Sequence, residues 1–204
     1  MKRILVATTN PGKLKEIRAG LADIGADILS LKDFPDVLPV EETGKTFEEN
    51  AKIKAKGYYA RTGVPTVADD AGLEIDALHG EPGVKTRRWI HGNRDSTDAE
   101  LVAYALKRLQ GVPDEKRTAR LRTVIAFYDG KKMHTATAAT EGRIVGEAAR
   151  DIEPGYPFRS LLFLPQFGKL YKDLTPAEHI KTNHRLMALK KLILSIQKAL
   201  AGTA

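Results

Sequence analysis

Cysteine is absent from this sequence, and its absence removes several kinds of chemistry at once. A chain without thiols forms no disulfide, holds no iron–sulfur cluster and has no cysteine nucleophile. Long apolar runs are also missing, so no segment reaches the roughly 18 residues that a membrane-spanning helix requires. The apolar start, residues 4–7, is too short for a secretory signal, and we interpret it as a strand. These features lead us to expect a cytoplasmic protein without a membrane partner.

Repeats, low-complexity tracts and long linkers are absent as well, which favours a single domain over residues 1–204. Apolar residues make up 42% of the chain, enough for a sizeable core. The net charge of +7 favours anionic partners such as phosphates, although solubility alone would explain it equally well. Because Lys and Arg are spread along the chain, a nucleic-acid-binding tail is not indicated.

Hydrophobic periodicity predicts strands that alternate with helices, the pattern of an α/β protein. We expect a hairpin with its turn at Asp129-Gly130, and strands at 4–7, 28–31, 64–68, 120–128 and 131–140. Amphipathic helices are expected from about Leu14 to Gly25 and over 184–200. Three further helices are expected to begin at capping boxes, in which glutamate follows a threonine three residues later: Thr46, Thr97 and Thr175.

Hydrogen-bond donors are concentrated between the first predicted strand and the first predicted helix. Backbone N–H groups at a helix start, together with the helix dipole, favour an anion. Thr8, Thr9 and Asn10 add side-chain donors, and Lys13 adds a positive charge. The spacing is not that of a P-loop. The segment therefore suggests a phosphate site, with a common Asn-Pro-Gly turn and a solvated lysine as the alternative.

Paired carboxylates occur at Glu41-Glu42 and at Asp69-Asp70. Mg²⁺ is usually held by one or two carboxylates together with phosphate oxygens of a substrate. The second pair follows an apolar strand, so we expect it at a strand end, where α/β proteins commonly bind ligands. A carboxylate in such a place could also accept a proton from an attacking water. A solvated loop is the alternative, more so for Glu41-Glu42.

Longer motifs surround these residues and follow one another in order. Residues 8–16 read TTNPGKLKE, residues 41–55 read EETGKTFEENAKIKA, and residues 68–83 read ADDAGLEIDALHGEPG. Asn183-His184-Arg185 stands near the C-terminus. Together these motifs resemble the nucleoside-triphosphate pyrophosphatases of the inosine triphosphatase family, the Ham1/RdgB-like enzymes, which carry T/S-x-N-x-x-K, E-E-T-G-x-T-F-x-E-N-A and S-H-R.

The resemblance implies an activity, a cofactor and a fold. The expected reaction is the Mg²⁺-dependent hydrolysis of deaminated purine nucleoside triphosphates (ITP, dITP and XTP) to the monophosphate and pyrophosphate, which cleans the nucleotide pool. The expected fold is a Maf/Ham1-like α/β fold, an elongated two-lobed mixed sheet with flanking helices and a central cleft. The expected assembly is a homodimer.

The same resemblance assigns roles to residues by their position in the motifs. Glu42 and Asp70 would bind the metal, and Asp70 would also be the catalytic carboxylate. The triphosphate would be bound by Thr8, Thr9, Asn10, Lys13 and Lys54. The rest of the nucleotide would be contacted by Ala71, which stands where the family has serine, and by His184 and Arg185. Whether Glu41 or Asp69 also binds metal is open at this point.

The segment expected to recognise the base departs from the family. Where the family has G-F-G-Y-D-P, this chain reads GYPFRS over residues 155–160. Tyr156 and Phe158 keep aromatic rings that could stack on a base. The family aspartate is replaced by Arg159, a donor-only cation that could donate to base carbonyl oxygens. Two alternatives follow: a pyrophosphatase for a different modified nucleotide, or a nucleotide- or RNA-binding protein that has lost catalysis.

Overall fold

A computed structural model describes residues 2–202, and the ends of the predicted domain, Met1 and residues 203–204, lie outside the described residues. The chain forms two compact units. The first unit comprises Met1–Asp70, Thr123–Ala138 and His184–Ala204, and the second comprises Ala71–Arg122 and Ala139–Asn183. Each unit has a hydrophobic core of its own.

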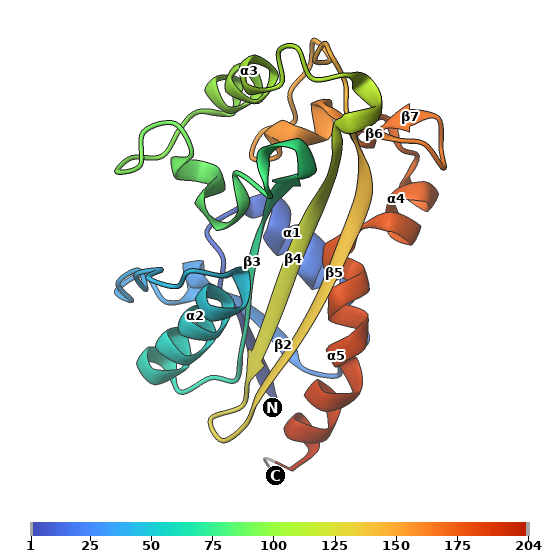
Figure 1. Cartoon of the computed structure of the whole chain (residues 1–204). Helices are drawn as coiled ribbons and strands as arrows, with labels where there is room; N and C mark the ends of the chain where they lie inside the picture. The colour runs from blue at the N-terminus through green and yellow to red at the C-terminus, as the bar shows by residue number, and fades with distance from the viewer. Residues whose placement is uncertain (1, 203–204) are drawn as a thin grey trace. The chain divides into compact units, whose positions relative to one another are not determined.

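One mixed sheet of seven strands runs in the order β2-β1-β3-β4-β5-β6-β7 (Figure 1). Strand β1 (Arg3–Val6) lies between β2 (Asp27–Ser30) and β3 (Thr66–Ile75) and is parallel to both. Strands of parallel sheets are usually covered on both faces, and residues 4–6 of β1 are fully buried. The mixed α/β fold expected from the sequence is confirmed.

Strands β4 (Thr118–Tyr128) and β5 (Met133–Ile144) are neighbours joined by a short turn. The side chain of Asp129 accepts hydrogen bonds from two N–H groups within that turn, and Gly130 has φ +97. The predicted hairpin is therefore confirmed. Strand β5 continues the sheet through antiparallel pairing with β6 (Leu162–Leu164), which pairs antiparallel with β7 (Lys169–Leu170).

Helices α1 (Pro11–Gly20) and α5 (His184–Ala201) share the core of the first unit. They pack so closely that a Cβ atom on Gly20 would lie 2.6 Å from Leu189 Cδ2. The other members of this core include Ile17, Leu192 and Ile196 from the helices and Ile4, Val6, Val67, Ile125 and Phe127 from the strands. Helix α2 (Phe47–Thr62) belongs to the same unit and lies on the other face of these strands (Figure 1).

All three predicted capping boxes are present. In each, the threonine hydroxyl accepts a hydrogen bond from the glutamate N–H, and the glutamate side chain accepts one from the threonine N–H. Thr46, Thr97 and Thr175 thereby begin α2, α3 (Asp98–Arg108) and α4 (Pro176–Thr182). These helix starts are set locally, because both partners lie within one helical turn.

The core of the second unit is built on α3 and on the unit's portions of β3, β4, β5 and β6. Short 3-10 helices complete the chain: Leu31–Asp33, Asp76–Leu78, η3 (Gly83–Arg88), Asp114–Lys116, η5 (Pro157–Ser160) and Tyr171–Asp173. None of the helices within residues 2–202 has the length and apolar character needed to cross a membrane.

Several element boundaries differ from the sequence prediction by a few residues, and the largest differences are at the ends of β3, α1 and β5, which runs to Ile144 instead of residue 140. Strand β3 continues to Ile75, so Asp69-Asp70 lies inside the strand and the prediction of a strand end was wrong. The strand continues because Leu73 and Ile75 are fully buried in the core of the second unit. Helix α1 ends at Gly20 instead of Gly25, because residues 21–24 form a turn whose apolar side chains still reach the core.

Leu189 and Leu194 of α5 provide a matched test of this packing, since they are 1% and 70% exposed. Leu189→Ala should lower the free energy of unfolding by about 2–5 kcal/mol, because it leaves a cavity that neighbouring side chains fill only in part. Leu194→Ala should change it by less than about 0.5 kcal/mol. Urea denaturation measures both values, and similar losses in the two variants would contradict the packing.

Candidate functional site

Asp69 and Asp70 are adjacent in β3, and their side chains meet different helices. Successive residues of a strand point to opposite faces of the sheet. Asp69 contacts Lys13 of α1 and Arg185 of α5, whereas Asp70 contacts Lys54 of α2. One acidic dipeptide therefore contributes to two polar clusters, which we call the Asp69 cluster and the Asp70 cluster.

The Asp69 cluster consists of Asp69, Lys13, Arg185 and Glu16. Asp69 Oδ2 lies 3.1 Å from Lys13 Nζ and 3.0 Å from Arg185 Nε. Arg185 also donates through Nη1 to Glu16. Asp69 and Arg185 are each 1% exposed, and buried charges of this kind are stable only when they are paired. The cluster thus connects β3, α1 and α5 inside the first unit.

The charge on Asp69 is maintained by its partners. Burial alone would raise the pKa of Asp69, but the positive charges of Lys13, Arg185 and Lys54 outweigh burial and hold this pKa below its usual range. Burial lowers the pKa of Lys13, against the opposing effect of Asp69. Asp69 is therefore a fixed anion that orients two cations, an arrangement that favours a structural role over metal binding.

The Asp70 cluster consists of Asp70, Lys54, Glu42 and Asn50. Lys54 Nζ lies 3.0 Å from Glu42 Oε2 and 3.7 Å from Asp70 Oδ1. Asn50 donates from Nδ2 to Asp70 Oδ2 at 3.1 Å. Asn50 and Lys54 are four residues apart, so both project from the same face of α2. The predicted metal ligands, Glu42 and Asp70, are thus placed next to the predicted phosphate ligand Lys54.

Gly44, in the loop before α2, allows that loop to lie close to the helix, so that Glu42 reaches Lys54. The N–H of Gly44 donates to Asn50 Oδ1 at 2.8 Å, and a Cβ atom at Gly44 would lie 2.7 Å from that oxygen. A larger residue would therefore push the loop away from the helix. Sequence reasoning missed both Gly44 and Asn50. Asn50 could have been found from its position one helical turn before Lys54.

The charges of the Asp70 cluster favour the binding of a cation, and they favour Asp70 as a proton acceptor. Burial raises the pKa of Asp70 above its usual range, although the charges of Lys54 and Lys13 oppose the shift. Burial would lower the pKa of Lys54, but the carboxylates of Asp70, Asp69 and Glu42 outweigh it and raise this pKa. Two carboxylates and one ammonium leave the cluster with one excess negative charge. Such an oxygen-rich set fits Mg²⁺, and a raised pKa makes a carboxylate a better base.

The loop before α1 uses some of the donors that we expected to be free for a phosphate. Asn10 Oδ1 accepts hydrogen bonds from the N–H groups of Gly12 and Lys13, at 2.9 and 3.1 Å. Thr8 Oγ1 accepts one from the Asn10 N–H at 3.2 Å. Asn10 is thus the N-cap of α1. The side chain of Thr9, which was predicted to bind the triphosphate, is exposed. We expected free backbone N–H groups at this helix start, but those of Gly12 and Lys13 are not free, because the side chain of Asn10 at the N-cap position accepts their hydrogen bonds.

His184 and Arg185 begin α5 and are buried, at 4% and 1% exposure. Arg185 was expected to contact the nucleotide, and the structure places its guanidinium against Asp69 and Glu16. Ala71, the residue after Asp70 in β3, is half-buried and belongs to the second unit.

The segment expected to recognise the base also lies in the second unit. Arg159 is 5% exposed, and its Nη1 lies 3.0 Å from both carboxylate oxygens of Glu153. Its guanidinium is 3.6 Å from the centroid of the Tyr156 ring and 4.9 Å from that of Tyr171. Phe158 is 3% exposed and belongs to the core, whereas Tyr156 is only half-buried. Tyr156 is therefore the more accessible of the two predicted aromatic side chains.

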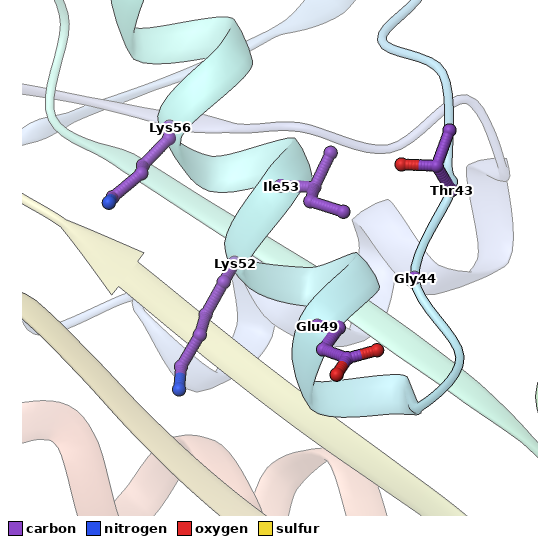
Figure 2. Close-up of a pocket in the computed structure, with 6 residues that line it drawn as sticks. All are labelled: Thr43, Gly44, Glu49, Lys52, Ile53 and Lys56. Atoms are coloured by element: carbon purple, nitrogen blue, oxygen red, sulfur yellow. The ribbon is translucent and has the colours of Figure 1, made fainter.

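A separate hollow of about 420 Å³ lies beside α2 (Figure 2). It is lined by Thr43, Gly44, Glu49, Lys52, Ile53 and Lys56. None of these was predicted to bind substrate or metal, and the Asp70 cluster uses other α2 residues. Within residues 2–202, no group of three or more His, Cys, Asp or Glu side chains could hold a metal ion. The pair Glu42 and Asp70 therefore stays the candidate metal site.

The part of the sheet in the first unit thus carries a lysine–carboxylate cluster on each face, and these groups could hold phosphate and a cation. The chain matches the Ham1 family over residues 4–194, so it belongs to that family.

Similar proteins and structures come from several bacteria. A protein of Geobacillus kaustophilus named dITP/XTP pyrophosphatase is 41% identical over 94% of this chain and 93% of its own length. One of the same name from Thermus thermophilus is 40% identical over 94% of this chain and 90% of its own length. The solved structure of a HAM1 protein from Coxiella burnetii has a TM-score of 0.84 and 32% identity over 97% of this chain and 100% of its own.

Asp69→Asn tests the Asp69 cluster. The substitution removes the anion between Lys13 and Arg185 and leaves two cations side by side in a buried place. We expect the free energy of unfolding at pH 7 to fall by about 3–5 kcal/mol, as it does when one partner of a buried ion pair is removed. Asp36→Asn, at an exposed position, is the matched control.

The difference in the free energy of unfolding between wild type and Asp69→Asn should depend on pH in a defined way. The pKa of Asp69 is depressed in the folded state, so its contribution to stability is fully present above the unfolded value of 3.8 and is lost as pH falls towards the folded value. The difference between wild type and Asp69→Asn should therefore be largest above about pH 5 and shrink below about pH 3. Urea denaturation across this range measures it, and a difference that does not vary with pH would contradict the assignment.

Proposed function

We propose that this chain hydrolyses deaminated purine nucleoside triphosphates, namely ITP, dITP and XTP, to the monophosphate and pyrophosphate. The observation that carries the proposal is the Asp70 cluster, in which Asp70 and Glu42 both contact Lys54. The names of the bacterial relatives support the substrate class. Such an activity removes deaminated nucleotides from the pool before they are built into DNA or RNA.

The residues of the first unit can meet the demands of this reaction. Water forms a bond to the α-phosphorus, the anhydride bond to the β-phosphate breaks, and pyrophosphate leaves. Lys54 and Lys13 supply positive charge for the phosphates. Asp70, whose pKa is raised by burial, accepts a proton from the water. Asn50 keeps the Asp70 carboxylate oriented through its hydrogen bond.

Mg²⁺ is the cofactor that we propose, and Glu42 and Asp70 are the residues that would hold it. The two carboxylates exceed the single ammonium of Lys54, so the donor set retains negative charge for a cation. When bound, Mg²⁺ neutralises phosphate charge and acidifies water. Lys54 contacts both carboxylates and thereby offsets their mutual repulsion.

We propose that the segment around residues 153–159 recognises the base, with Tyr156 as the stacking ring. The sequence suggested that Arg159 donates directly to base carbonyl oxygens. Its burial and its pairing with Glu153 favour an indirect role, in which Arg159 supports the ring of Tyr156. The replaced family aspartate also favours a second candidate function, a pyrophosphatase for a different modified nucleotide. The homodimer stays a prediction.

Pyrophosphate release from ITP, dITP, XTP, GTP, ATP, CTP, UTP and a set of modified nucleotides tests the proposed activity. With Mg²⁺ we expect ITP, dITP and XTP to react fastest. Asp70→Asn removes the proton acceptor and should lower kcat by at least roughly 100-fold, whereas Asp36→Asn should react like the wild type. Turnover of another nucleotide alone would favour the second candidate. Release from none of them would reject both and favour a nucleotide-binding protein without catalysis.

Arg159→Asp and Arg159→Lys test the role of Arg159 in base preference. Arg159→Asp removes the cation beneath Tyr156 and places a second carboxylate near Glu153. We expect the ratio of kcat/KM between ITP and XTP to change by roughly 30-fold, the equivalent of one desolvated cation–π contact. Arg159→Lys keeps the charge and should change the ratio less. An unchanged ratio in a variant that remains folded by circular dichroism would rule out this role.

A further inference from the structure

The backbone of Gly155, next to Tyr156, is held on both sides by one ion pair. The N–H of Gly155 donates to Asp98 Oδ2 at 2.7 Å, and the carbonyl oxygen of Gly155 accepts from Arg87 Nη2 at 3.2 Å. Arg87 Nη1 lies 2.5 Å from Asp98 Oδ1. The three residues come from α3, from η3 and from the segment before η5, all within the second unit.

We call the Arg87–Asp98 ion pair, with its two hydrogen bonds to Gly155, the Gly155 clamp. The clamp fixes the direction of the backbone just before Tyr156. The N–H and the carbonyl of Gly155 lie on opposite sides of its Cα atom, so holding both restrains both of its backbone dihedrals. Gly155 has φ +82, a conformation that other residues rarely adopt. The clamp thus maintains a backbone shape that positions the side chain of the following residue.

Tyr156 is held from its other side as well. Its ring lies against the guanidinium of Arg159, which Glu153 binds with both carboxylate oxygens. The N–H of Tyr156 donates to the carbonyl oxygen of Glu153 at 2.9 Å. A ring fixed through both its backbone and its face is pre-organised, as a stacking platform for a flat ligand should be.

The start of α3 has a capping box that does not involve Asp98. Thr97 and Glu100 already form the capping box of this helix, and buried Leu101, Val102 and Ala105 attach it to the core. Asp98 instead directs both carboxylate oxygens away from its own helix, one to Arg87 and one to Gly155. Charge-assisted hydrogen bonds of this kind are stronger and more directional than neutral ones.

We propose that Arg87 and Asp98 are positioning residues that set the selectivity for the purine base by clamping Gly155 and so orienting Tyr156. The proposal rests on the proposed function, because it takes residues 153–159 as the segment that recognises the base. Neither side chain needs to contact the nucleotide. Removing either one releases the segment and weakens base binding, while the Asp70 cluster and its chemistry stay in place.

Asp98→Ala and Arg87→Met test the clamp directly. Hydrogen exchange read by NMR should show the Gly155 amide exchanging roughly tenfold faster in Asp98→Ala, since one charge-assisted hydrogen bond is lost. Calorimetric titration with IMP, XMP and AMP should show IMP and XMP binding weakened roughly tenfold in both variants, with a smaller preference over AMP. In turnover of ITP, KM should rise by a similar factor while kcat stays within about twofold.

Arg108→Met is the matched control, because it removes another half-exposed pair of α3, Arg108–Glu81 at 2.9 Å, that does not touch Gly155. It should leave the Gly155 amide and the base preference unchanged. Unaltered exchange of Gly155 in Asp98→Ala would overturn the clamp. Faster exchange of the Gly155 amide with an unchanged preference for IMP and XMP over AMP would overturn the positioning role. A fall in kcat that accompanies the rise in KM for every nucleotide would overturn it as well. Nucleotide binding without turnover by the wild type would reject only the proposed function.

Discussion

The alternation of side chains along β3 is the constraint on which both polar clusters depend. Because Asp69 and Asp70 are neighbours in a continuous strand, one carboxylate is directed to Lys13 and Arg185 and the other to Lys54. A shift of the strand by a single residue would exchange the two faces. The apolar residues that follow in β3 are fully buried and oppose such a shift. A reactive carboxylate is thus held in register by ordinary hydrophobic packing further along the strand.

The two clusters differ in charge balance, and this difference separates their roles. The Asp69 cluster has two cations and two anions, so each buried charge has a counter-charge. The Asp70 cluster has two anions and one cation. A balanced buried network keeps its side chains in fixed positions, whereas an unbalanced one gains from an added cation. The same strand therefore carries on one face a balanced network that fixes the position of Lys13, and on the other face a network with an excess negative charge.

Local chemistry made much of the fold predictable from the sequence. The capping boxes at Thr46, Thr97 and Thr175 and the Asp129-Gly130 turn lie within a few residues of their partners, and the structure contains all of them. The proximity of Glu42, Lys54 and Asp70 followed only from the family resemblance, because it joins a loop, a helix and a strand. The burial of Arg159 was not predictable from the replaced motif, since its surroundings are set by tertiary packing against Tyr171 as well as by residues near it in sequence.

The sole tryptophan of the chain, Trp89, allows the unfolding of one unit to be distinguished from that of the whole chain. Trp89 belongs to the second unit, where its ring meets Tyr104 edge-on at 5.0 Å and its Nε1 donates to Glu81. Its fluorescence therefore follows the second unit alone, whereas far-UV circular dichroism averages over the helices of both units. Coincident melting curves would mean that the sheet makes the two cores one cooperative system, and separated curves would mean that each core melts by itself.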